Sequence, residues 1–158
     1  MRQIIYFIKQ LIAKIMGHYP LPAYHFTVDW GGTRTGFIEV SGLNISVDVT
    51  EFRDGTDPNK AARKMPGHFN FSNIILKRDI VKGDNDFFRW MQTINLNKDE
   101  RRDIVVTLLN ENHEPVIRWK VNNSFPVKLT GPVLTANSNN VAIEELELAH
   151  EGISVEMV

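Results

Sequence analysis

The chain has 158 residues, of which 42% are hydrophobic and 23% are charged, as is ordinary for a soluble globular protein. This length fits one domain with its own core. The formal net charge of −1 gives no bulk attraction to nucleic acid or to anionic membranes. Cysteine is absent, which excludes disulfides and thiolate chemistry.

The first 18 residues form an extension before a domain that we place at residues 19–158. Apolar residues recur there at helical spacing: Ile4, Ile5, Phe7, Ile8, Leu11, Ile12, Ile15 and Met16. The run is too short and too charged to span a bilayer, and no cleavage site marks a signal peptide. Three interpretations remain: a helix on a membrane surface, a helix packed on the body or on a partner, or upstream sequence before a start at Met16, which we favour.

The body begins with β patterns. Residues 19–22 (Tyr-Pro-Leu-Pro) predict a stiff extended lead-in, and residues 24–30 alternate between apolar and polar side chains, which is typical of a half-buried strand. A turn at 31–33 leads to a strand over 37–50. One face of this strand is predicted to be buried (Leu43, Ile45, Val47, Val49) and the other wet (Asn44, Ser46, Asp48, Thr50).

Residues 53–67 predict a long loop, because three turn signals interrupt the segment. A loop of this length is usually functional or ordered by a partner. We expect contact with a neighbouring protein subunit through Arg53, Asp54, Asp57, Lys60, Arg63 and Lys64. Nucleic acid fits less well, because acidic residues share the loop. A calcium site fits poorly, because the central glycine and the closing glutamate are missing.

The second half alternates strands with one helix. A strand over 68–78 shifts its apolar phase between Phe71 and Ile74, which predicts a bulge or a bend. Gly83-Asp84 opens a helix that Asp84 can cap, and an apolar stripe predicts core packing (Phe87, Trp90, Met91, Ile94). Strands over 103–109 and 116–122 are joined by a hairpin at 110–114. A loop over 131–140 and a final strand pattern over 141–155 follow.

No constellation of catalytic residues emerges. The five histidines are scattered, without the spacing of a helical metal pair, and the glutamates of 144–156 fit an exposed strand face. No nucleophile, base and orienting group come together. The sequence therefore predicts no catalytic, cofactor or metal site, and a protein that is not an enzyme.

Several segments, in order, resemble the tail tube family of contractile phages and extracellular contractile injection systems, especially the tubes of antifeeding-prophage-like particles. The segments are Tyr-Pro-Leu-Pro-Ala-Tyr-His-Phe (19–26), Phe-Ile-Glu-Val-Ser-Gly-Leu (37–43), Glu-Phe-Arg-Asp-Gly (51–55), Lys-Met-Pro-Gly (64–67), Ser-Asn-Ile-Ile-Leu-Lys-Arg (72–78), Phe-Arg-Trp-Met (88–91) and Asn-Ser-Phe-Pro (123–126). Asp79 departs from the family, which commonly has glycine there, and residues 1–15 have no counterpart.

The resemblance implies a mainly β fold, a small β-barrel or sandwich with one packed helix. It implies hexameric rings of this chain, stacked into a tube that conducts protein or nucleic-acid cargo. Expected partners are a sheath protein, a baseplate hub and a tube cap. The particle would assemble in the bacterial cytoplasm and be released or ejected, without stable membrane anchoring.

The same resemblance assigns Asn44, Ser46, Asp48 and Thr50 to the wall of the lumen, because the corresponding family strand contributes to it. Exposed polar residues on the outside of a monomer are the alternative. Related alternatives for the whole chain are a baseplate hub or tube-initiating protein of the same fold, or a type VI secretion tube subunit. A monomeric β-barrel binding module is a further one.

Overall fold

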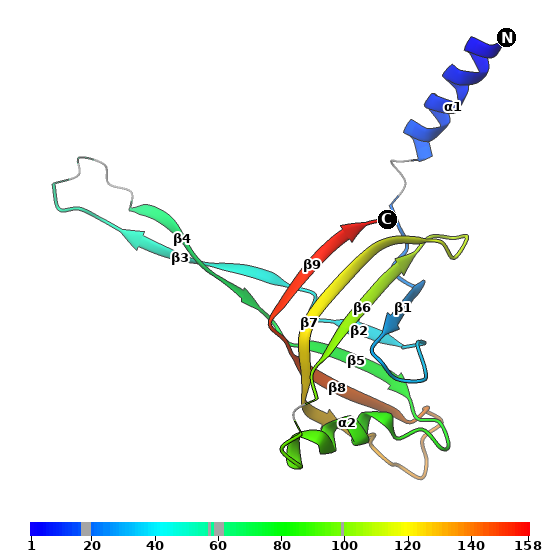
Figure 1. Cartoon of the computed structure of the whole chain (residues 1–158), viewed down its shortest axis with the longest axis vertical. Helices are drawn as coiled ribbons and strands as arrows, with labels where there is room; N and C mark the ends of the chain where they lie inside the picture. The colour runs from blue at the N-terminus through cyan, green and yellow to red at the C-terminus, as the bar shows by residue number, and fades with distance from the viewer. Residues whose placement is uncertain (17–19, 57, 59–61, 99) are drawn as a thin grey trace.

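The computed structural model describes residues 1–16, 20–56, 58, 62–98 and 100–158. Its element order is α1 (Arg2–Met16), β1 (Phe26–Asp29), β2 (Glu39–Ser41), β3 (Ile45–Phe52), β4 (Arg63–Phe71), β5 (Ile74–Asp79), α2 (Asp86–Asn95), β6 (Arg102–Leu109), β7 (Pro115–Thr130), β8 (Ile143–Ala149) and β9 (Gly152–Met157). Figure 1 shows a body of strands with α2 at one end, from which α1 and a long hairpin project in different directions.

The body is one bent antiparallel sheet in the order β1-β6-β7-β8-β5-β2, with β9 added along β7. The long strand β7 joins its two halves: residues 115–124 pair with β6, and residues 125–130 pair with β8. A register shift between Pro126 and Lys128 lies in the second half, where a bulge increases local twist. The path of paired strands runs from β1 to β2 without closing into a barrel in the described residues. The predicted mainly β fold with one packed helix is confirmed.

The core lies between the two halves of the sheet and α2. Its fully buried residues come from five strands of the body, from the turn after β1 and from α2: Val28, Trp30, Ile74, Leu76, Phe87, Trp90, Ile104, Val121, Leu146 and Leu148 among them. Trp30 is central, since its indole N–H donates to the Arg34 carbonyl at 2.8 Å and its ring meets Phe87 edge-on at 5.0 Å between centroids. A Cβ at Gly32 would lie 2.0 Å from the Trp30 ring, so only glycine fits this turn.

The helix predicted after Gly83-Asp84 is confirmed as α2. Its N-cap residue is Asn85, whose side chain makes no capping bond. Asp84 nevertheless satisfies one free donor of the first turn, because its Oδ1 accepts from the Asp86 N–H at 3.2 Å. In the predicted stripe, Phe87 and Trp90 are fully buried, whereas Ile94 is 37% exposed at the end of the helix.

Several strand predictions change in detail. The predicted strand over 37–50 is divided between β2, which belongs to the sheet of the body, and β3, which pairs with β4 in a separate sheet. The predicted single strand over 68–78 is two strands, because the chain leaves β4 at Phe71 and enters the body as β5 at Ile74. The phase shift between those residues therefore marks a passage between two sheets. The final segment is also two strands, β8 and β9, divided near Glu151, whose N–H donates to the Asn122 carbonyl at 3.0 Å. The hairpin at 110–114 and the loop over 131–140 form as predicted.

Candidate functional site: the projecting hairpin and its stem

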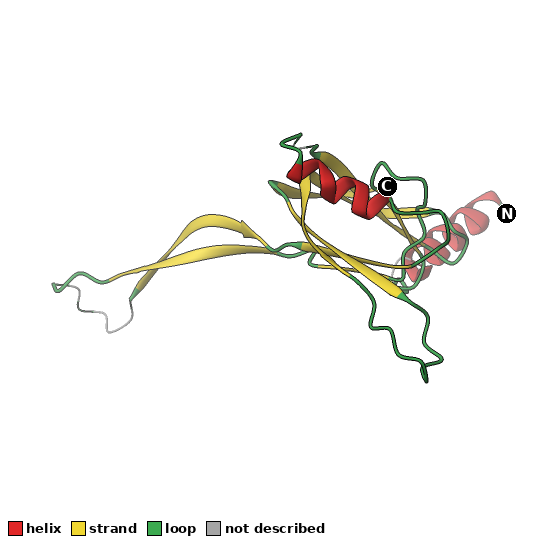
Figure 2. Cartoon of the chain, turned by 90° about the horizontal axis from the view of Figure 1, so that it is seen from below, coloured by secondary structure: helices red, strands yellow, loops and turns green. Residues whose placement is uncertain are grey.

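Strands β3 and β4 form a separate two-stranded sheet that reaches far out from the body (Figures 1 and 2). Their register runs from the pair Ile45–Phe71 beside the body to the pair Phe52–Arg63 near the tip. A register shift lies between Val47 and Val49. There Gly67 allows close packing, since a Cβ on it would lie 3.1 Å from the Asp48 carbonyl.

The hairpin corrects two predictions. The strand over 37–50 was expected to be half-buried, but all eight residues of β3 are exposed. The loop over 53–67 was expected to lack strand structure, but β4 begins at Arg63 and includes the supposed Pro-Gly turn at 66–67. Alternation of side chains predicts a strand with two unlike faces. Alternation does not determine whether another part of the same chain covers the apolar face of the strand.

One side of the hairpin is an apolar surface without cover. Ile45, Val47 and Val49 share a face of β3, and Phe69 lies opposite Val47 on the same face. These four side chains are 49%, 41%, 59% and 68% exposed, in that order. We call these four residues the apolar hairpin face. Exposed apolar surface of this kind on a soluble protein marks a contact with another molecule.

The other face carries three of the four residues predicted for a lumen. Ser46, Asp48 and Thr50 lie together on β3 and are exposed, with Asn70 and Met65 paired beside them. The Asn70 amide donates to Asp48 Oδ1 at 2.6 Å. Asn44 lies just before the strand, and its N–H donates to the Gly42 carbonyl at 2.7 Å. We call Ser46, Asp48, Thr50 and Asn70 the polar hairpin face.

The residues predicted for an inter-subunit loop divide into three groups. Arg53 and Asp54 lie near the tip and are exposed. Arg63 and Lys64 belong to β4, opposite Phe52 and Glu51. Asp57 and Lys60 lie outside the described residues.

The tip has a local turn of its own. The Thr56 N–H donates to Asp54 Oδ1 at 3.1 Å. Hydrogen bonds from the backbone and side chain of Thr56 hold the pKa of Asp54 below its usual range. Asp54 is therefore anionic at neutral pH and takes part in a turn.

The stem of the hairpin, where the chain leaves the body near Gly42 and returns near Ser72, fixes the direction of the hairpin. Gly42 has φ of +90°, and a Cβ on it would lie 2.0 Å from the Asn73 carbonyl oxygen, so glycine is required there. The Ser72 hydroxyl donates to the Gly42 carbonyl at 3.0 Å. His150 Nε2 lies 2.8 Å from the Ser72 carbonyl. Its ring lies 5.7 Å from that of Phe71. Contacts from His150, just after the end of β8, thus hold the segment where the hairpin leaves the body.

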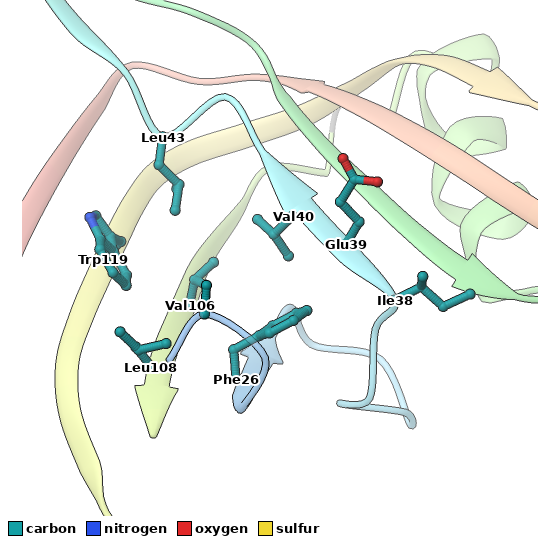
Figure 3. Close-up of a pocket in the computed structure, with 9 residues that line it drawn as sticks. Phe26, Ile38, Glu39, Val40, Leu43, Val106, Leu108 and Trp119 are labelled. Carbon is teal, nitrogen blue, oxygen red and sulfur yellow. The ribbon is translucent and has the colours of Figure 1, made fainter. Parts of the chain in front are cut away.

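No chemical site competes with this surface in the described part of the chain. No cluster of three or more His, Asp or Glu side chains is placed there to hold a metal ion. A pocket of about 270 Å³ opens between the sheet halves (Figure 3) and is lined mainly by apolar side chains: Phe26, Val40, Leu43, Val106, Leu108 and Trp119. The carboxylate at its rim, Glu39, pairs with Lys77 at 3.2 Å. The pocket therefore lacks the convergent polar groups that catalysis needs.

These features define a class of protein: a mainly β fold with a long projecting hairpin, one face of which is apolar and exposed. Residues 22–154 match the sequence pattern of the family described as T4-like virus tail tube protein gp19. The match covers most of the chain, and the chain belongs to this tail tube family. The predicted family is confirmed.

Solved structures agree with this assignment. The chain is 37% identical to a chain of the extracellular contractile injection system PVC sheath–tube complex in the extended state, with a TM-score of 0.83 over 92% of this chain and 97% of that chain. It is 36% identical to a chain in the structure of the anti-feeding prophage cap, with a TM-score of 0.82 over 89% and 93%. Hcp1 from Flavobacterium johnsoniae, at 20% identity and a TM-score of 0.52 over 84% and 95%, shares the fold. No match is found among curated proteins.

Sequence reasoning predicted the exposed polar side of β3 (Ser46, Asp48, Thr50) but missed the exposed apolar side, because it assigned Ile45, Val47 and Val49 to a buried face. A signal was available, because two alternating strands flank a short polar segment rich in turn residues. This pattern is that of a hairpin. Pro66 and Gly67 obscured it, since both residues are uncommon inside strands.

Proposed function

We propose that this chain is the structural inner-tube subunit of an extracellular contractile injection system, without enzymatic activity. Its copies form hexameric rings that stack into a tube around a lumen, through which protein or nucleic-acid cargo passes. Identities of 36–37% to chains of PVC and anti-feeding prophage particles, over about nine tenths of this chain, support the proposal. The partners are a sheath protein, a baseplate hub and a tube cap. The particle assembles in the cytoplasm and acts outside the cell.

The observation that carries the proposal is the uncovered apolar hairpin face. A subunit of a ring contacts its neighbours through two different surfaces, and the rotation between copies closes the ring. The hairpin projects away from the body (Figure 2), so both of its faces are accessible to a neighbouring copy. Burying Val47, Val49 and Phe69 there would remove their apolar area from water, at roughly 25 cal/mol for each Å².

The same arrangement gives the polar hairpin face a role. If the apolar face lies on neighbours, the opposite face points to water, and Ser46, Asp48 and Thr50 line the lumen together with Asn44. The residues that contact the next subunit under this proposal are those of the inter-subunit segment predicted from the sequence: Arg53, Asp54, Asp57, Lys60, Arg63 and Lys64. Residues 19–158 form the tube domain, and residues 1–18 are an extension to it.

Two matched variants test whether the apolar hairpin face is a contact between subunits. Val47→Glu and Ser46→Glu each add one carboxylate at adjacent positions on opposite faces of β3. In Val47→Glu the charge would be buried without a partner, so the concentration for half-assembly should rise at least about tenfold. Ser46→Glu should assemble at a concentration close to that of the unmodified protein. Negative-stain microscopy and sedimentation measure tubes, and circular dichroism verifies the fold.

Normal tubes from Val47→Glu would show that the apolar hairpin face is not a joint between subunits. A soluble monomer from the unmodified protein, folded and concentrated, would contradict the tube function itself.

A further inference from the structure

Helix α1 (Arg2–Met16) is an amphipathic element that no described part of the body covers. Its apolar side chains from Ile4 to Ile15 are all between 47% and 70% exposed. Figure 1 shows the helix beyond the end of the sheet, away from the hairpin. It also lies before residue 22, where the match to the tail tube family begins. Its function therefore lies outside what the family match covers.

The helix separates its side chains cleanly. At 100° per residue, about half of the circumference is apolar, comprising Ile4, Ile5, Phe7, Ile8, Leu11, Ile12 and Ile15. The other half of the circumference carries the charged and polar side chains: Arg2, Gln3, Tyr6, Lys9, Gln10 and Lys14. Within that half Gln10 donates to the Tyr6 hydroxyl at 3.2 Å. An apolar face this wide needs a large flat or grooved apolar partner.

The charge of α1 decides which partner fits. Arg2, Lys9 and Lys14 are three of the 18 cations of the chain, and none of its 19 acidic residues lies in residues 1–16. A bundle of α1 copies would bring like charges together, which is unfavourable. Wide apolar faces combined with cations are typical of helices that lie in the interface of an anionic bilayer.

We propose that α1 is a lipid-surface helix, which lies on anionic bilayers with its apolar face among the acyl chains. Lys9 and Lys14 stand near the two borders of the apolar half, where their ammonium groups reach lipid phosphates while the stems stay in apolar surroundings. No described helix is long and apolar enough to cross a membrane. The contact is therefore reversible adsorption. Several α1 copies on one assembly would bind more strongly than one.

The test uses the full chain of 158 residues and vesicles of phosphatidylcholine alone or mixed equally with phosphatidylglycerol. Leu11→Glu places a charge in the apolar half of α1. Leu134→Glu is its matched control, because it makes the same change at a leucine that is 84% exposed on a loop of the body. Co-flotation with vesicles measures binding. Added salt screens the attraction between α1 and the anionic lipids, and so distinguishes the electrostatic part of vesicle binding from the apolar part.

We expect flotation with anionic vesicles and much less with neutral ones. Leu11→Glu should lower the partition at least about tenfold. Each of Lys9→Gln and Lys14→Gln should lower it about fivefold. Leu134→Glu should bind like the unmodified protein. Equal flotation of Leu11→Glu and Leu134→Glu, or equal binding to both vesicle types, would overturn the proposal.

Protein partners of α1 give a different result. If Leu11→Glu changes the sedimentation of lipid-free protein and flotation is absent, α1 packs on another copy and the lipid proposal is wrong. Negative-stain microscopy of the same samples keeps the tube function separate, because tubes can form whether or not vesicles are bound.

Discussion

Arg78 is the most deeply buried charge of the described residues, and its surroundings explain how the body tolerates it. The side chain is fully buried. Its Nε donates to Glu144 at 2.7 Å, its two terminal nitrogens lie 3.3 Å from Asp84, and its guanidinium covers the Phe87 ring at 3.7 Å. The buried cation thus joins β5, β8 and the start of α2. Removing one partner of such a pair leaves an uncompensated charge.

Asp84 connects this cluster to the turn after Trp30. Arg34 Nε donates to Asp84 at 2.6 Å. Arg34 also binds the Asp79 side chain at 3.2 Å and its carbonyl at 2.6 Å. Asp79 ends β5 and serves as an acceptor for Arg34.

The acid stability of the protein should depend on Asp84. Burial raises the pKa of this carboxyl, but the Asp86 N–H, Arg34 and Arg78 together outweigh burial and hold the pKa below its ordinary value of 3.8. A carboxyl with a depressed folded pKa stabilises the fold above its unfolded pKa, and this contribution is lost as the pH falls through the folded value. The stabilising contribution of Asp84 is therefore lost at pH values below about 4.

Thermal unfolding from about pH 7 to about pH 3 measures this effect. Asp84→Asn should melt below the unmodified protein at neutral pH, and the gap should narrow as the acid limit is approached. A gap that stays constant across this range would mean that the charge of Asp84 does not stabilise the body.

The position of Asp48 in the tube can be tested through a single thiol. The protein has no cysteine, so Asp48→Cys introduces the only one. If the polar hairpin face lines the lumen, a small maleimide should label monomers and tubes, whereas a probe wider than the channel should label only monomers. Efficient labelling of intact tubes by the wide probe would place Asp48 on the outside.

At the scale of elements, α2 should be a stability element. Phe87 is fully buried against Trp30 and Arg78, whereas its neighbour Phe88 is 51% exposed. Phe87→Ala should cost about 3–5 kcal/mol, which is a large part of the stability of a typical domain. Phe88→Ala serves as the matched control, with an expected cost within about 0.5 kcal/mol. Denaturant unfolding measures both, and equal stability of the two variants would show that the stripe is not core.

The two projecting elements serve different contacts under our proposals. The hairpin has an apolar face and a polar one in a family of tube proteins, and it suits contact with other copies. Helix α1 is basic and precedes the family match, and it suits an anionic lipid surface. Each element keeps its secondary structure without a partner for different reasons: the strands of the hairpin pair with each other, and α1 satisfies its hydrogen bonds internally.

At the scale of the whole molecule, the sheet depends on β7, because the two parts of this strand pair with different neighbours. Its first part pairs with β6 and β9, and its second part pairs with β8. The sequence predicted a strand that ends at residue 122. In the structure Asn123 has φ of +49°, yet β7 continues to Thr130. Ser124 explains the continuity, because it is buried and its hydroxyl donates to the Arg102 carbonyl across the sheet.

The sequence by itself determined the mainly β body, the helix with Phe87 and Trp90 in the core, and membership in the tail tube family. Period-two alternation, helical spacing and turn residues depend on neighbours along the chain, so these features can be derived locally. Only the tertiary structure decided that the apolar side of β3 has no cover. Whether an apolar face is buried depends on where the chain places other elements, and Gly42 and Ser72 at the stem direct this hairpin away from the body.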